Sequence, residues 1–152
     1  MDRILKRIKK ERVLIIGIGN RLKGDDGVGS ILAEKLKEKN KKENLLIIDA
    51  ENMPENYIGI IRRFSPSLIL IIDAIDFGSF SGDFRIFEIK EIKDTTFSTH
   101  NFSILLFKKL INKSDIYLLG IQPENLNLQE GLSYKVNLAI EKIIEKFKNF
   151  LS

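Results

Sequence analysis

Cysteine and tryptophan are absent from this chain of 152 residues, which has only one histidine and three prolines. The lack of cysteine excludes disulfide bonds, thiolate metal ligands and a cysteine nucleophile. A chain without disulfides is also typical of the cytoplasm, where we expect this protein to act.

Long apolar runs are missing as well. The longest, around Leu68 to Ile72, is far too short to cross a bilayer. The basic residues near the N-terminus are not followed by the apolar core of a signal peptide. We therefore expect neither a membrane segment nor a secretory leader.

The net charge of +4 is modest, and Lys and Arg are interspersed with Asp and Glu along the chain. Basic residues are densest in segments 6–12 and 35–42. Neither segment carries the interleaved aromatic residues of a nucleic-acid stacking surface. These segments are better explained as solvated helix surfaces, and we predict no nucleic-acid partner.

The length of the chain fits one domain with a genuine hydrophobic core. We place this domain at residues 12–152, after a basic N-terminal extension at 1–11 that is helical or frayed. Within the domain, short apolar strands alternate with segments of helical periodicity. Strands are predicted at 13–16, 45–49, 67–72, 84–89 and 115–120, and helices at 28–39, 52–63, 102–111 and from Ser133, a candidate helix cap, onward.

This alternation predicts an α/β fold: a single three-layer domain with a mainly parallel, twisted sheet of about five strands and helices on both faces. The segment 84–89 follows a short loop and is expected to be the one antiparallel strand, at an edge. For the helix at 52–63, Asn52 is the expected cap, with Pro54 in the first turn.

The segment 13–29 is the most informative stretch of the sequence. Its apolar strand ends in a turn at Gly17 and Gly19, and the adjacent acids Asp25 and Asp26 follow. Because parallel strands end at a shared edge, these acids are expected to lie near Asp49, the last residue of the second strand, and Asp73, in the loop after the third. Ligands usually bind at this edge of an open α/β sheet.

A nucleotide site is the first interpretation of the Gly-x-Gly turn. The dinucleotide fingerprint requires a third glycine where this chain has Leu22. Two carboxylates in the loop would also repel a pyrophosphate. No Walker lysine pattern occurs, so we predict no nucleotide cofactor.

A metal site is the second interpretation, with Asp26, Asp73 and the only histidine, His100, as ligands. Carboxylates and imidazole together suit a divalent ion such as Zn, Ni or Fe. Simpler roles remain open: Asp25 or Asp26 would cap the helix at 28–39, Asp73 would accept hydrogen bonds from loop amides, and His100 would cap the next helix.

Nucleophilic catalysis is the third interpretation, through Ser98 or Ser103 beside His100. Neither serine has the Gly-x-Ser-x-Gly elbow, so this is disfavoured. An aspartic dyad of Asp25 and Asp26 is disfavoured too, because neighbouring side chains generally point apart.

Four segments in this order resemble the maturation endopeptidases of [NiFe] hydrogenases, and most closely those that serve the hydrogenase 3 large subunit. They are Gly17-Ile-Gly-Asn-Arg-Leu-Lys-Gly-Asp-Asp-Gly-Val-Gly29, Leu70-Ile-Ile-Asp-Ala-Ile-Asp-Phe-Gly78, Thr99-His-Asn101 and Leu119-Gly-Ile-Gln-Pro123. The resemblance covers the chain from about residue 13 to the last helix. One departure is Ala50-Glu51, where relatives usually have one or two glycines.

The resemblance implies an α/β peptidase that removes a C-terminal extension from the large-subunit precursor after nickel insertion. It assigns metal contact to Asp26, Asp73 and His100, with the nickel supplied by the substrate; other divalent cations would also fit. Asp25 would orient its loop or act as a base. The alternative is a chaperone that checks the precursor for nickel without cutting it. Residues expected to contact the substrate are Gly17, Gly19, Asn20, Gly27 and Asp49.

Overall fold

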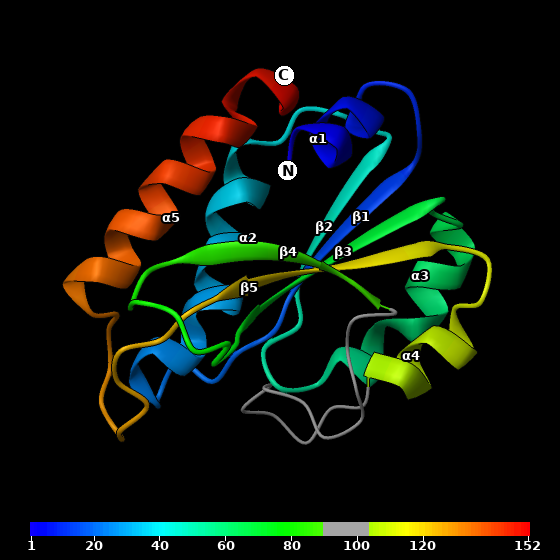
Figure 1. Ribbon diagram of the computed structural model, residues 1–152. Helices are drawn as coiled ribbons and strands as arrows, with labels where there is room; N and C mark the ends of the chain where they lie inside the picture. The colour runs from blue at the N-terminus through cyan, green and yellow to red at the C-terminus, as the bar shows by residue number, and fades with distance from the viewer. Residues whose placement is uncertain (90–103) are drawn as a thin grey trace.

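The structure is a computed structural model that describes residues 1–89 and 104–152 (Figure 1). One sheet runs through the centre of the molecule. Four of its strands are mutually parallel, and β4 pairs with β5 in the antiparallel sense. In spatial order the strands are β2 (Leu45–Asp49), β1 (Val13–Gly17), β3 (Leu68–Ala74), β5 (Asp115–Ile121) and β4 (Phe84–Glu88).

Helices cover both faces of the sheet, which confirms the predicted three layers (Figure 1). Each face has its own apolar cluster because alternate strand residues point to opposite sides, Ile15 to one cluster and Ile16 to the other. The first face carries α1 (Asp2–Ile8), α2 (Val28–Lys39), α5 (Tyr134–Phe147) and the 3-10 helix η4 (Lys148–Phe150). The second carries α3 (Ile58–Phe64) and α4 (Ile104–Leu110).

The N-terminal segment forms a helix and is not frayed. In α1, Ile4, Leu5 and Ile8 are buried in the same cluster as α2 and α5. Its basic residues face solvent, apart from the half-buried Arg7. The amphipathic pattern of the segment thus joins α1 to the core of the domain.

Two expected elements differ from the structure. The helix predicted from Asn52 begins as a separate 3-10 turn, η2 (Pro54–Tyr57), preceded by Met53 and without a side-chain cap, and α3 follows it. Within α3, Ile61 is buried whereas Ile60 is exposed. The third strand continues beyond Ile72 because β5 pairs with it as far as Ala74.

None of the helices in the described part of the chain is both long and apolar enough to cross a membrane.

Candidate active site

Asp26 and Asp73 lie at the carboxyl edge of the parallel strands. Asp26 belongs to η1 (Gly24–Gly27), a 3-10 helix that follows β1 and packs against β3. Asp73 is the penultimate residue of β3, so the expectation that it lies in a loop is wrong. The loop that leads from β1 to η1 is joined to β3 by the Ile18 N–H, which donates to the carbonyl oxygen of Ile72 over 2.9 Å.

Both carboxylic acids are almost fully buried, with exposed fractions of 2% for Asp26 and 1% for Asp73. Burying ionised carboxylates is costly unless hydrogen bonds, a proton or a cation compensate them. The Asn20 N–H donates a hydrogen bond to Asp26 Oδ2 over 3.3 Å. The sheet edge therefore places two carboxyl groups in a largely water-excluded position.

His100, the third predicted ligand, lies outside the described residues, as do Ser98 and Ser103. Within residues 1–89 and 104–152, no group of three histidine, aspartate or glutamate side chains is arranged to hold a metal. Of the three predicted metal ligands, the structure describes the two aspartates, Asp26 and Asp73. Two carboxylates with an added imidazole would fit a borderline divalent ion.

Glycines shape this edge by letting the chain approach itself closely. A Cβ at Gly17 would clash with the backbone of α2, and one at Gly19 would clash with the carbonyl of Asp26. At Gly27 it would stand 2.7 Å from the Cα of Arg21. The space of the missing Cβ is thus filled by the protein's own chain. Substrate contact by these glycines stays a prediction.

Asn20 folds the loop back toward Asp26. Its Oδ1 accepts a hydrogen bond from the Leu22 N–H over 3.0 Å, and its carbonyl oxygen accepts one from the Lys23 N–H over 3.1 Å. Together with the Asn20 N–H on Asp26, these bonds fix the path between Gly19 and η1. Asn20 therefore orders the loop, and its contact with the substrate stays a prediction.

Arg21 is a residue whose role the sequence did not reveal. Its guanidinium donates to Asp49 Oδ2 over 2.9 Å and to Ser30 Oγ over 2.8 Å, and it pairs with Glu34 over 2.8 Å. Asp49, predicted to bind substrate, is thus joined to the loop after β1. Its other oxygen, Oδ1, accepts from the Glu51 N–H over 3.1 Å.

Glu51 stands in the left-handed backbone region, with φ of 49°. Its carbonyl oxygen accepts a hydrogen bond from the Gly19 N–H over 2.8 Å. This region is costly for residues with a Cβ and is the usual place of glycine. The geometry explains why the family resemblance predicts glycine beside this turn, where the present chain has Ala50 and Glu51.

Asp25 is fully buried, and its carboxylate accepts four hydrogen bonds. Oδ2 accepts from the Glu124 N–H and the Asn125 N–H, each over 2.9 Å, and from Ser133 Oγ over 2.8 Å. Oδ1 accepts from the Ser133 N–H over 2.7 Å. Neither Asp25 nor Asp26 caps α2, which is preceded by Gly27 and has no side-chain cap.

Ser133 does precede α5, as expected of a helix cap, but its hydroxyl makes no capping hydrogen bond. The hydroxyl instead donates to Asp25. A hydrogen bond to a charged carboxylate is stronger than one to a neutral group, which accounts for the difference.

Gln122 is a second residue that sequence reasoning missed, although it lies within the segment at 119–123 that resembles the family. Its buried side-chain amide accepts from the Phe77 N–H over 2.9 Å and the Ser79 N–H over 3.2 Å. Its Nε2 donates to Asp76 Oδ1 over 3.1 Å. These hydrogen bonds connect the loop after β3 to the residue that follows β5.

The same contacts influence the ionisation of Asp76. The hydrogen bond from Gln122, assisted by one from the Gly78 N–H, lowers the pKa of Asp76 below its ordinary value. Asp76 is therefore held as a carboxylate within the loop that follows β3.

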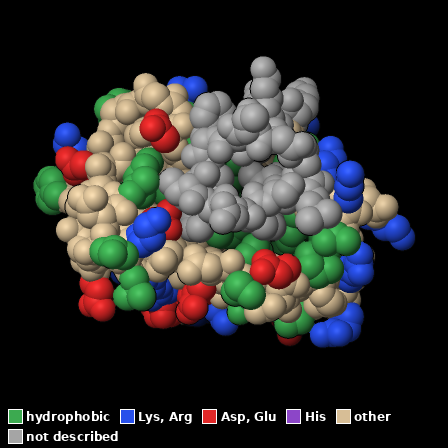
Figure 2. Space-filling view, turned by 90° about the horizontal axis from the view of Figure 1, so that it is seen from below, with side chains coloured by type: hydrophobic (Ala, Val, Ile, Leu, Met, Phe, Trp, Pro, Cys, Tyr) green, Lys and Arg blue, Asp and Glu red, His purple; other side chains and the backbone are tan. Residues whose placement is uncertain are grey.

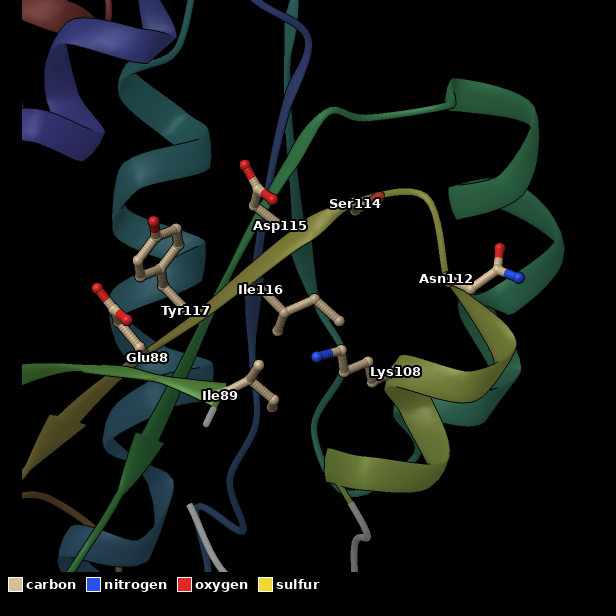
Figure 3. Close-up of a pocket in the computed structure, with 8 residues that line it drawn as sticks. All are labelled: Glu88, Ile89, Lys108, Asn112, Ser114, Asp115, Ile116 and Tyr117. Atoms are coloured by element: carbon tan, nitrogen blue, oxygen red, sulfur yellow. The ribbon is translucent and has the colours of Figure 1, made fainter. Parts of the chain in front are cut away.

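A cavity of about 380 Å³ lies at the opposite end of the sheet (Figure 3). Its lining includes Glu88 at the end of β4, Lys108 from α4 and Asp115 at the start of β5. Because β5 begins here, this cavity is separate from the carboxyl edge that carries Asp26 and Asp73.

The fold is shared with a class of peptidases. Over residues 31–149 the chain matches the family described as hydrogenase maturation protease. It is 31% identical to the hydrogenase 3 maturation protease of Escherichia coli, with 90% of this chain and 89% of that protein covered.

Solved structures of similar proteins belong to the same class of peptidases. A [NiFe] hydrogenase maturation protease of Thermococcus kodakarensis is 34% identical, with 98% of both chains covered and a TM-score of 0.85. An Escherichia coli endopeptidase is 30% identical, with 92% of this chain and 91% of that chain covered and a TM-score of 0.78. The chain belongs to the hydrogenase maturation protease family and is an endopeptidase, a hydrolase.

Proposed function

We propose that this endopeptidase removes the C-terminal extension of a [NiFe] hydrogenase large-subunit precursor after nickel has been inserted, and that it does so in the cytoplasm. The observation that carries the proposal is the pair of buried carboxylates, Asp26 and Asp73, on neighbouring segments of one sheet edge. Membership of the hydrogenase maturation protease family supplies the reaction class.

The nickel is proposed to arrive as part of the substrate. Asp26, Asp73 and His100 would contact it, and the carboxylate and imidazole donors match the preferences of a borderline divalent ion, so other divalent cations would compete. A bound metal of this kind polarises a carbonyl group or lowers the pKa of a bound water. Recognition of the metal would place the scissile bond beside these side chains.

Exposed apolar side chains around the same edge support docking of a protein substrate there. Among the residues described, seven large apolar side chains are exposed, and five lie in segments that follow the carboxyl ends of parallel strands. Figure 2 shows the face seen from below in Figure 1, with hydrophobic side chains on it. The five are Leu22, Met53, Phe80, Leu128 and Tyr134.

Among these five exposed side chains, Leu22 and Leu128 have a backbone position fixed by pairing between two segments. The residues after them, Lys23 and Gln129, form a parallel β-bridge, so both leucines come directly before the point where the loop that leads to Asp26 pairs with the segment after β5. Their exposed fractions are 62% and 84%, so neither contributes much to the core. Exposed apolar groups gathered near a site are typical of a protein-binding surface.

The test is an intact-mass measurement of the precursor before and after incubation with the purified protein. We expect loss of one fixed C-terminal peptide from nickel-loaded precursor and no change in nickel-free precursor. Equal cleavage of both forms would disprove nickel recognition. Tight binding to the nickel-loaded form without any change in mass would instead support the nickel-checking chaperone.

A further inference from the structure

The segment after β5 is held against the loop of Asp26 by an unusual concentration of hydrogen bonds on one side chain. The fully buried carboxylate of Asp25 accepts three backbone N–H groups and one hydroxyl, all from residues 124–133. Since charged acceptors make stronger hydrogen bonds than neutral ones, this carboxylate holds residues 124–133 in place.

Backbone contacts run in parallel with the side-chain contacts. The Asp25 N–H donates to the Asn125 carbonyl over 2.8 Å, and the Gly24 N–H donates to the Gln129 carbonyl over 2.8 Å. Lys23 and Gln129 add a β-bridge. Residues 23–25 and 124–133 therefore form one hydrogen-bonded unit, which we name the Asp25 clamp.

We infer that Asp25 is a positioning residue that acts through Asp26, and that it is not a base. The inference rests on the proposed function, in which Asp26 contacts the metal of the substrate. Asp26 is the next residue in the short helix η1, and its N–H donates to the Lys23 carbonyl over 3.1 Å. Fixing Asp25 and Lys23 to the segment after β5 therefore fixes the backbone from which the Asp26 carboxylate projects.

The geometry does not suit Asp25 to proton transfer. A general base must come within hydrogen-bond distance of the proton that it removes, either directly or through a water. Both oxygens of Asp25 already accept hydrogen bonds from the protein, and none of the side chain is exposed.

Ser133 allows the two roles to be separated, because Ser133→Ala weakens the clamp while the Asp25 carboxylate stays in place. We expect Ser133→Ala to lower kcat for nickel-loaded precursor by about 5- to 10-fold, as for loss of one ordinary hydrogen bond, with the shape of the pH–rate profile unchanged. Ser133→Thr, which keeps the hydroxyl, should restore the rate. Asp25→Asn should lower kcat further with the same profile.

The matched control is Ser67→Ala. Ser67 also donates its hydroxyl to a carboxylate, that of Glu11, but at the opposite end of the sheet. The Ser67→Ala variant should lower the melting temperature of the protein without changing kcat. If Ser133→Ala leaves kcat unchanged while Asp25→Asn abolishes cleavage and removes one limb of the pH profile, Asp25 is a base and the inference is wrong.

A second measurement needs no substrate. Hydrogen exchange followed by ¹⁵N NMR should show the Asp26 amide exchanging about 10-fold faster in Ser133→Ala than in wild type or Ser67→Ala. Unchanged exchange would overturn the clamp even if the enzyme is active. Failure of the wild-type protein to cut nickel-loaded precursor would instead overturn the proposed function and leave the exchange result standing.

Discussion

The side-chain amide of Gln122 joins the end of β5 to Asp76, with 3.1 Å between its Nε2 and Asp76 Oδ1. The same amide accepts hydrogen bonds from the Phe77 and Ser79 N–H groups. One buried side chain therefore fixes the loop after β3 at the edge where Asp73 lies. Gln122 and Asp25 hold neighbouring loops by the same means, a buried polar group that accepts several backbone N–H groups.

Replacing Gln122 by leucine should destabilise the protein. Two backbone N–H groups lose their acceptor, at a cost of about 1–3 kcal/mol for each one that stays buried. The pKa of Asp76 should rise toward its ordinary value, because the hydrogen bond from Gln122 is the largest cause of its lowering. Urea unfolding and an NMR titration of the Asp76 carboxyl carbon measure the two effects. A stable variant with an unchanged Asp76 titration would contradict this role.

The predicted metal contacts can be tested by near-isosteric changes. Asp26→Asn and Asp73→Asn should each lower cleavage of nickel-loaded precursor by more than the roughly 10- to 100-fold typical of losing an outer partner of a metal site. His100→Ala should do the same. The readout is the mass of the large subunit, with circular dichroism to verify folding. The matched control is Asp115→Asn, because Asp115 begins β5 and so lies at the end of the sheet opposite to Asp26 and Asp73.

Much of this site follows from the sequence because apolar periodicity fixes the strands. The continuous apolar run in β3 and the short run in β1 predicted strands of one mainly parallel sheet, and parallel pairing brings Asp26 and Asp73 to one edge. That inference needs only the order and direction of the elements. It is therefore the part of the site that local patterns predict.

The contacts between loops could not be predicted in this way. The bonds of Arg21 to Asp49, Asp25 to Ser133 and Gln122 to Asp76 join residues 28, 108 and 46 positions apart in the sequence. Which loop side chains meet depends on how the helices pack on the sheet, which periodicity does not specify. The Ser133 position shows the limit: its place before a helix was predicted, but the partner of its hydroxyl was not.

The two leucines beside the Asp26 loop should affect substrate binding more than stability. Leu22→Ser combined with Leu128→Ser should raise KM for the precursor several-fold at nearly constant kcat, because apolar contact area with the substrate is lost. The free energy of unfolding should change by less than about 0.5 kcal/mol per substitution, since both side chains are exposed. Leu110→Ser is the control, an exposed leucine at the end of α4. An unchanged KM in the double variant would exclude this surface.

Glu51 offers a test of stored backbone strain. Glu51→Gly should stabilise the protein by up to about 1 kcal/mol, because a residue with a Cβ is disfavoured at φ of 49°. The gain is reduced by the greater freedom of glycine in the unfolded chain. Glu51→Ala is the matched control, since it removes the carboxylate but keeps the Cβ, and it should bring no gain. Equal stabilities of the glycine and alanine variants would show that the turn is unstrained.

The contact between α1 and the sheet should make stability depend on pH through Glu11. Hydrogen bonds from Arg7 and then from Ser67 lower the pKa of Glu11 below its ordinary value of 4.5. Because the folded-state pKa is depressed, the stabilisation is fully present above pH of about 4.5 and is lost as the pH falls through the folded-state value. Glu11→Gln removes the titrating group, so its stability should fall less steeply over this acid range than that of wild type. Thermal unfolding between pH of about 6 and about 3 measures both slopes. Parallel curves for the two proteins would mean that the hydrogen bonds of Glu11 contribute no net stability to the folded state.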